Sequence, residues 1–141
     1  MARKVLILLG TKKGAFILEG DDRRRSFALR GPYCDNWPMN HVVADPSRGT
    51  VYAGGGNEWF GPAVWKSSDL GATWTHSSEG LAYAAGETPI KAVWSLAKHG
   101  ERLYAAWGGA KQKILLTGAG HNSTDDDPMF WPAIRKFLGI S

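Results

Sequence analysis

Oxygen-bearing side chains gather near the C-terminal end of the sequence, where three consecutive aspartates follow an asparagine. Asn122, Asp125 and Asp127 offer amide and carboxylate oxygens, the ligands that Ca²⁺ prefers in proteins. Their spacing differs from an EF-hand loop, which needs alternate ligands and a bidentate Glu. The favoured alternative is a helix start, with an Asp as N-cap and Pro128 in the first turn. Calcium is thus the one cofactor for which the sequence supplies candidate ligands, since no His or Cys spacing indicates zinc.

The remaining reactive and charged groups argue against several classes of function. Cys34 is the sole cysteine, so no internal disulfide forms, which favours a reducing compartment and a cytoplasmic protein. The net charge is +4, and the three arginines at 23–25 are too few for a typical nucleic-acid patch, so we interpret them as a solvated loop. No apolar stretch is long enough to span a membrane, and the sequence after Leu9 lacks a signal-peptide cleavage site. We therefore expect neither a nucleic-acid nor a membrane partner.

Short apolar segments between glycine-rich turns indicate a mainly antiparallel β-structure. The sequence contains seven Trp and 18 Gly, a combination typical of aromatic-rich strands joined by tight turns. Four expected strands between residues 41 and 76 have the length and layout of one propeller blade. The strands that we expect span residues 5–9, 15–18, 26–30, 41–44, 50–53, 63–66, 73–76, 92–96, 102–105 and 114–117.

The strand pattern repeats along the first part of the chain. Tyr52 and Tyr104 occupy equivalent places in two units, at a separation within reach of known blade periods. The first unit fits the same scheme when residues 8–10 and 15–17 take the places of the second and third strands. The pattern therefore predicts a partial β-propeller of two to three four-stranded antiparallel blades.

An eight-residue turn motif lies between two of the expected strands. The sequence Ser-Ser-Asp-Leu-Gly-Ala-Thr-Trp at 67–74 fits the Asp-box pattern S-x-D-x-G-x-T-W. In such a turn the Asp can accept hydrogen bonds from amides, the Gly can take a positive φ and the Trp can pack between blades. With the segments 54–65 and 89–96, the motif resembles the bacterial-neuraminidase-repeat family and the sialidase-like propeller glycosidases over residues 3–107. The structural Asp-box residues are Ser67, Asp69, Gly71, Thr73 and Trp74.

The resemblance to Asp-box propellers implies six to eight blades, of which this chain supplies about two and a half. It implies that the starts of the innermost strands face a central channel and that the Asp box lies away from it. The sialidase catalytic set of three Arg, a Tyr–Glu pair and an acidic Asp cannot be placed in this sequence. For each residue implied to lie near the channel, blade packing or a turn is the alternative role. These residues are His41 and Glu58 as candidate catalytic groups, and Asn40, Asn57, Lys91 and Trp94 as candidate substrate-binding groups.

The segment after residue 109 differs in character from the repeats. An apolar stripe at helical spacing predicts a C-terminal α-helix near residues 128–138, after a strand and a loop. Residues 113–138 resemble the C-terminal end of α/β-hydrolases, which implies that His121 is the general base. Because the chain has no G-x-S-x-G nucleophile elbow, the alternatives for His121 are a remnant, a base acting on water and a loop residue. We expect one compact unit with two parts, a partial propeller over 1–109 and a tail over 110–141. The change of character at their junction suggests a fused or frame-shifted reading frame.

Both resemblances point to hydrolases of small molecules. Ester or lactone hydrolysis is the chemistry that the two architectures share, so the sequence predicts a small, atypical ester or lactone hydrolase. The alternatives are a non-enzymatic propeller fragment that binds a carbohydrate or a protein, and a sialidase-type glycosidase remnant. We also expect a homodimer, because the end blades of an incomplete propeller expose apolar faces. The residues expected on those faces are Val5, Ile7 and Leu9 at one end and Leu103, Tyr104 and Trp107 at the other.

Overall fold

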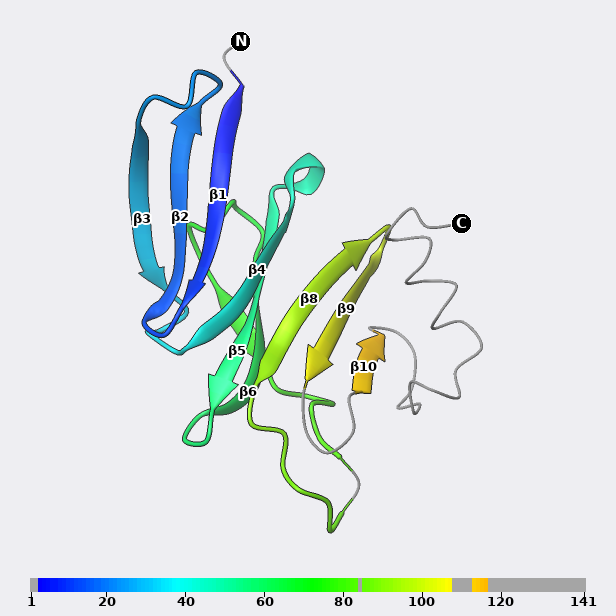
Figure 1. Cartoon of the computed structure of the whole chain (residues 1–141). Coiled ribbons are helices and arrows are strands. Elements are labelled where there is room, and N and C mark those ends of the chain that lie inside the picture. The colour runs from blue at the N-terminus through cyan, green and yellow to red at the C-terminus, as the bar shows by residue number, and fades with distance from the viewer. Residues whose placement is uncertain (1–2, 84, 108–112, 117–141) are drawn as a thin grey trace.

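A computed structural model describes residues 3–83, 85–107 and 113–116 of the chain. In these residues the fold is mainly β, and its strands form three antiparallel sheets (Figure 1). The predicted C-terminal helix lies outside the described residues, as do His121 and the candidate calcium ligands Asn122, Asp125 and Asp127. Within the described ranges, no helix is long and apolar enough to cross a membrane.

The first sheet has three strands in the order β1-β2-β3. They are β1 (Lys4–Thr11), β2 (Gly14–Asp21) and β3 (Phe27–Tyr33). β1 and β2 form the predicted hairpin, with Thr11 paired to Gly14 at its closed end. Alternate side chains of a strand point to opposite faces, and this places the fully buried Ala15 and Ile17 on the face toward the second sheet.

The second sheet has four strands in the order β4-β5-β6-β7. β5 continues through the glycines at 54–56, where the sequence predicts a turn, because their backbone pairs with both β4 and β6. Glycine is required in this run, since a Cβ on Gly55 would lie 2.0 Å from the carbonyl oxygen of Pro38. The elements are β4 (Met39–Asp45), the 3₁₀ turn η1 (Pro46–Arg48), β5 (Thr50–Asn57), β6 (Gly61–Ser67) and a short β7 (Thr75–Ser77).

The third sheet has the strand order β10-β9-β8. Its strands are β8 (Val93–His99), β9 (Arg102–Trp107) and β10 (Lys113–Leu116). β10, predicted as the first strand of the tail, is hydrogen-bonded to β9 and so completes a sheet begun by the repeats. The boundary between 109 and 110 stays a prediction, because the residues that follow β10 lie outside those described.

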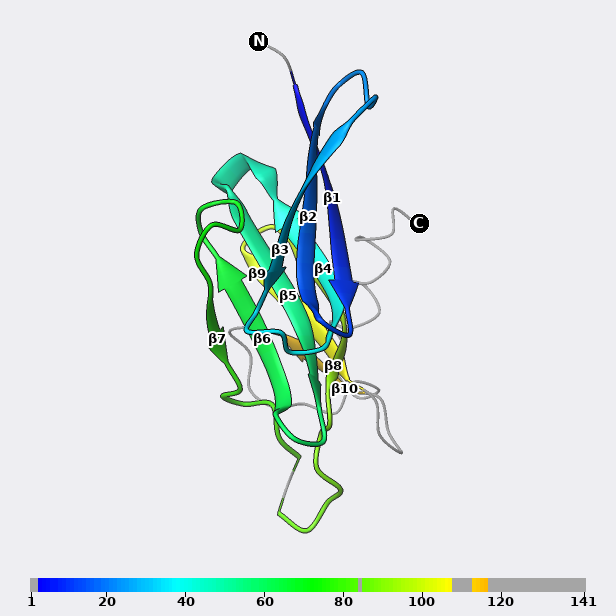
Figure 2. The ribbon, with the colours of Figure 1, turned by 90° about the vertical axis from the view of Figure 1, so that its left-hand side faces the viewer.

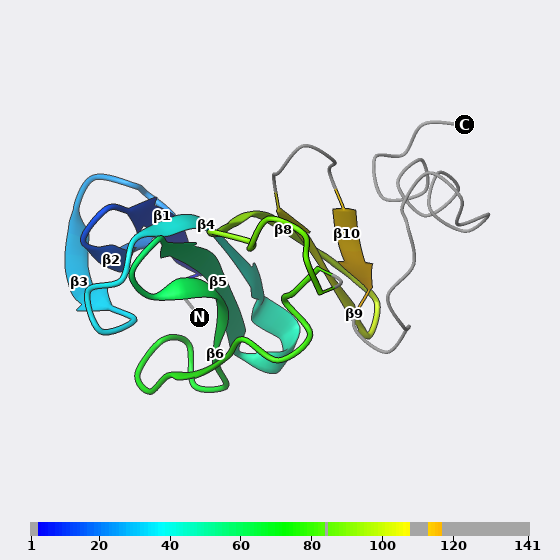
Figure 3. The same cartoon turned by 90° about the horizontal axis from the view of Figure 1, so that it is seen from below.

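The three sheets stand one after another like the leaves of a fan (Figure 3). β4 of the second sheet contacts both β1 and β8, so the sheets meet along their first strands. β4 and β8 run in the same direction, whereas β1 runs the opposite way, as β5 and β9 do (Figure 1). The direction of β1 thus matches the predicted equivalence of residues 8–10 to a second strand. Among the described residues, the first sheet therefore has no strand at the place that β4 and β8 hold in theirs.

Two apolar clusters fill the spaces between the sheets. The cluster between the first and second sheets includes Ala15, Val51 and Trp65, and the cluster between the second and third includes Val93 and Leu96. Leu103 and Trp107 belong to the second cluster and are 6% and 3% exposed. The expectation that both lie on an open end face is therefore wrong, because β9 turns these side chains toward the second sheet. The other expected end face is confirmed in part, since Ile7 and Leu9 are 41% and 40% exposed.

Candidate functional site

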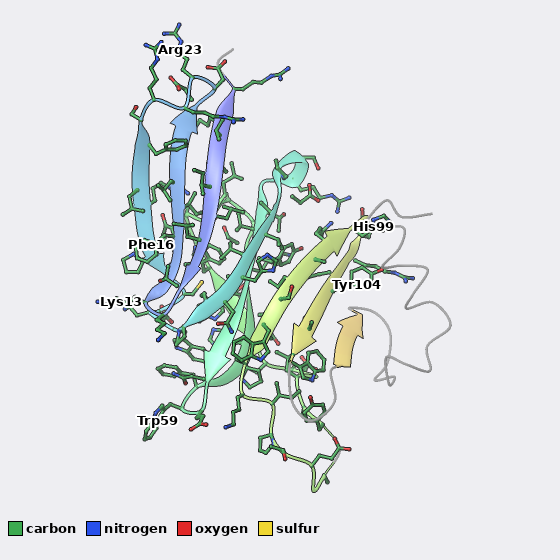
Figure 4. The ribbon with its side chains drawn as sticks, in the orientation of Figure 1. Lys13, Phe16, Arg23, Trp59, His99 and Tyr104 are labelled. Atoms are coloured by element: carbon green, nitrogen blue, oxygen red, sulfur yellow. The ribbon has the colours of Figure 1, made fainter. Side chains whose placement is uncertain are left out.

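The loop between β5 and β6 projects aromatic side chains beyond the end of the second sheet (Figure 4). The Oδ1 of Asn57 accepts hydrogen bonds from the backbone N–H groups of Trp59 and Phe60, both at 2.9 Å. This side-chain turn fixes the loop and makes Asn57 a turn residue, one of the roles that the sequence leaves open for it. Trp59 is 91% exposed and Phe60 is 49% exposed. The loop therefore presents two large apolar side chains to solvent.

A series of aromatic rings in contact connects this loop to the core. Phe60 stacks on Trp37, with ring centroids 4.5 Å apart and planes tilted by 14°. Trp37 meets the edge of the buried Trp65, which in turn stacks on His76 at 4.3 Å. Such contacts add to the apolar burial of each ring and restrict its motion. Phe60 is therefore anchored on the core, whereas its neighbour Trp59 has no ring contact within the described residues.

An exposed ion pair joins the same loop to the segment before the third sheet. Nζ of Lys91 lies 2.5 Å from Oε1 of Glu58, and the two side chains are 61% and 72% exposed. The hydrogen bond and charge of Lys91 lower the pKa of the Glu58 carboxyl below its ordinary value. Glu58 is therefore ionised at neutral pH and unsuited to act as a general acid. Trp94, three residues after Lys91, is 58% exposed on β8.

Asn40 and His41, by contrast, fasten the second sheet to the third. Nδ2 of Asn40 donates to the carbonyl oxygen of Val93 at 2.9 Å. Nδ1 of His41 accepts the backbone N–H of Leu96 at 2.9 Å. The alternative role that the sequence allows for these two residues, packing between sheets, accounts for both contacts.

The surroundings of His41 do not form a catalytic dyad. The hydroxyl oxygen of Ser95 lies 3.4 Å from Nδ1 of His41, but that nitrogen already accepts the amide of Leu96. It is therefore not free to take a proton from Ser95 as a general base would. A cleft of about 530 Å³ runs past these groups, and its one lysine, Lys98, is paired with Asp45 at 3.2 Å.

The turn at 67–74, at the opposite end of the second sheet, is closed by its own side chains. Oδ1 and Oδ2 of Asp69 accept the backbone N–H and the hydroxyl of Thr73, at 2.8 and 2.6 Å. The Ser67 hydroxyl donates to Asp69 and accepts the N–H of Gly71, at 2.7 and 2.8 Å. These bonds, the Thr73 side chain's first, lower the pKa of Asp69 to about 2. Asp69 is thus committed to the turn.

The same turn packs against the first sheet. Gly71 has a φ of +90°, and a Cβ there would lie 2.4 Å from Cδ1 of Ile17. Nη2 of Arg30 donates to the carbonyl oxygen of Leu70 at 2.5 Å. The ring of Trp74 lies 5.9 Å from that of Tyr33, and its indole N–H donates to the carbonyl of Gly71. The turn therefore holds the first two sheets together.

Neither a metal-binding cluster nor a reactive thiol occurs in the described part of the chain. No cluster of three or more His, Cys, Asp or Glu side chains suited to a metal ion occurs among the described residues. Cys34 is buried, and burial raises the pKa of its thiol to about 12, so it is no nucleophile.

The structure brings Asn57, Glu58 and Lys91 together near the start of β8. Asn40 is bonded to Val93 at that same start, and with His41 it serves the sheet interface. Trp59 and Phe60 lie outside the site that the sequence predicts, although an aromatic pair at the tip of a glycine-flanked hairpin is a usable signal for a contact surface. Neither the models of known protein families nor the curated proteins contain a match to this chain.

Proposed function

We propose that the protein binds a carbohydrate at the end of the second sheet that carries Trp59. The observation that carries this proposal is the exposure of Trp59 at 91%, with Phe60 and Trp94 exposed at 49% and 58%. Large exposed apolar groups near one another are unusual on a soluble protein and mark contact surfaces. A sugar ring suits such a surface, because its C–H face packs on an aromatic ring while its hydroxyls require polar partners.

The Glu58–Lys91 pair supplies those polar partners. Its carboxylate accepts and its ammonium donates hydrogen bonds, and both lie exposed beside the aromatic side chains. A sugar hydroxyl can bind both groups at once, since it is a donor and an acceptor. Binding is the alternative to hydrolysis that the sequence leaves open, and it requires no nucleophile.

The fold that we propose for the chain is the first part of an Asp-box β-propeller. Three features support it: sheets placed side by side with first strands in contact, the repeated strand directions, and the internally bonded turn at 67–74. In such a fold the loop at 57–60 and the segment before β8 lie at one end of the fan, and the 67–74 turn lies at the other. If the sugar binds at the end that carries the 57–60 loop, the 67–74 turn has a packing role only.

Hydrolysis of an ester or lactone stays a separate prediction that depends on His121. Among the described residues, His41 has its Nδ1 occupied and Glu58 is paired, so neither is poised for catalysis. A screen with short p-nitrophenyl esters and lactones, with and without EDTA, tests the prediction. If turnover occurs, His121→Ala should lower its rate by about 10²–10⁴-fold, as loss of a general base does. No turnover in either condition leaves binding as the function.

The binding proposal is tested by calorimetric titration of the full chain with a panel of neutral and acidic oligosaccharides. We expect one class of sugar to bind, and Trp59→Ala to weaken it at least about tenfold, because central aromatic contacts dominate binding energies. Arg23→Ala is the matched control, since Arg23 is exposed at the far end of the first sheet (Figure 4). Equal affinity for the wild type and Trp59→Ala, or no binding to any sugar, would refute the proposal.

A further inference from the structure

The outer face of the first sheet, which points away from the second sheet, consists of apolar side chains. Register places Ile7 opposite Leu18 and Leu18 opposite Leu29, and residues directly opposite share a face. In the same way Leu9 pairs with Phe16, and Val5 lies in the row of Gly20 and Phe27. The outer face is therefore defined by Val5, Ile7, Leu9, Phe16, Leu18, Phe27 and Leu29.

The charges of this sheet lie elsewhere. Glu19 pairs with Lys4 and Arg30, and it belongs to the rows that alternate with those of the outer face. Leu29, on the edge strand β3, is 64% exposed, and Figure 4 shows Phe16 pointing away from the second sheet. Figure 2 views the molecule from this side and shows the sheet standing in front of the others. An apolar sheet face of this kind is one half of a sheet-on-sheet packing.

We propose that the outer face packs against the same face of a second copy of this chain, with the strands antiparallel. We infer that a second copy covers the outer face because none of the residues that define this face is charged. The outer faces of two copies can therefore pack on each other without burying a charge. The outward rows of the third sheet include His99 and Arg102, opposite each other in the register, so head-to-tail packing would bury charge against apolar side chains. An isologous two-fold contact avoids this and closes the assembly.

Charges at the two ends of the first sheet select the antiparallel arrangement. Asp21 ends β2 and Asp22 follows it, ahead of Arg23, while Lys12 and Lys13 precede β2 at the other end. A two-fold axis in the plane of contact and across the strands brings the aspartates of one copy beside the lysines of its partner. A two-fold axis parallel to the strands would instead place the lysines of the two copies side by side, where their like charges repel.

The charges that flank the edge strand β3 favour the same antiparallel arrangement. Arg24 and Arg25 precede β3, and Asp35 follows its far end, so the antiparallel arrangement brings these opposite charges together across the dimer. Within the described part of the chain, none of these arginines, lysines and aspartates at the ends of the sheet forms an ion pair. Oδ1 of Asp21 accepts the backbone N–H groups of Arg23 and Arg24, so Asp22 is the aspartate of that end that is available to a partner.

The test is light scattering after size exclusion of the full chain at about 50 μM. We expect the mass of a dimer for the wild type and for Trp59→Ala, because Trp59 belongs to the β5–β6 loop of the second sheet and not to the outer face. Leu29→Asp should yield a monomer, with a dissociation constant raised at least tenfold. Leu29 is largely exposed in the single chain, so an unchanged circular dichroism spectrum will show that the variant folds.

Charge exchange tests the orientation. Lys13→Glu should weaken the dimer severalfold, and Lys13→Glu with Asp22→Lys should restore it, because the pair then exists with its signs reversed. A monomeric wild type, or a Leu29→Asp variant that stays dimeric, would overturn the proposal. If Leu29→Asp dissociates the dimer but neither charge variant changes its dissociation constant, the antiparallel arrangement would be overturned.

Discussion

The two ends of the second sheet are built from the same kinds of residue and use them differently. At one end Asp69, Ser67 and Thr73 bond to one another, and Trp74 packs against the first sheet. At the other end Asn57 closes a turn of similar kind, but the Trp that follows is 91% exposed. A polar turn and a Trp therefore serve stability at one end and present a contact surface at the other. The difference lies in whether a neighbouring sheet stands against the turn.

The comparison predicts that substitutions at the 67–74 turn destabilise the fold, whereas those at the 57–60 loop do not. Gly71→Ala should have the largest effect, about 2–4 kcal/mol in the free energy of unfolding. The new Cβ meets Ile17 at 2.4 Å in a backbone conformation that L-residues rarely adopt. Urea denaturation followed by circular dichroism measures it. Trp59→Ala is the control and should stay within about 0.5 kcal/mol of the wild type.

The contribution of the 67–74 turn to the free energy of unfolding should also fall in acid. The pKa of Asp69 is lowered from 3.8 to about 2, so folding favours its ionised form. Its contribution is complete above the unfolded value of 3.8 and is lost as the pH falls through about 2. Asp69→Asn should therefore flatten the decline of stability between pH 4 and pH 2, in denaturation series run at each pH. An identical decline in the variant would mean that other carboxylates cause it.

A smaller effect is expected at the interface between the second and third sheets. Asn40→Ala removes the hydrogen bond to the carbonyl of Val93 and should cost about 1 kcal/mol. Sugar affinity should fall less than in Trp59→Ala, because Asn40 contacts the backbone of Val93 and lies outside the 57–60 loop. A variant of normal stability that fails to bind sugar would return Asn40 to the binding site that the sequence predicts for it.

The smallest effect on stability is expected at the exposed ion pair. Glu58→Gln should change the free energy of unfolding by less than about 0.5 kcal/mol, since exposed pairs contribute little. It should nevertheless weaken sugar binding, because a carboxylate is a stronger acceptor than an amide. Glu58→Gln should thus change the sugar affinity more than the stability, whereas Asn40→Ala should change the stability more than the sugar affinity. Denaturation measures the stability and calorimetry measures the affinity.

The sequence predicts the 67–74 turn well because all of its internal bonds lie within eight residues. The strands follow from local patterns in the same way, although β5 extends beyond its predicted end where neighbouring strands hold the glycines in line. The contacts of Asn40 and His41 join residues 53 and 55 positions apart, and only the packing of the sheets reveals them. Leu103 was expected on an open face for the same reason, since a strand pattern does not say which face meets a neighbour.

The most direct test of the central claim follows the indole N–H signals of the seven tryptophans by NMR during titration with the sugar that binds. Single Trp→Phe variants assign the signals. We predict that the signals of Trp59 and Trp94 shift, because both indoles lie exposed at the loop end, and that the Trp74 signal stays in place. Shifts at Trp74 with none at Trp59, or no shift in any indole signal, would contradict the division of the second sheet into a binding end and a structural end.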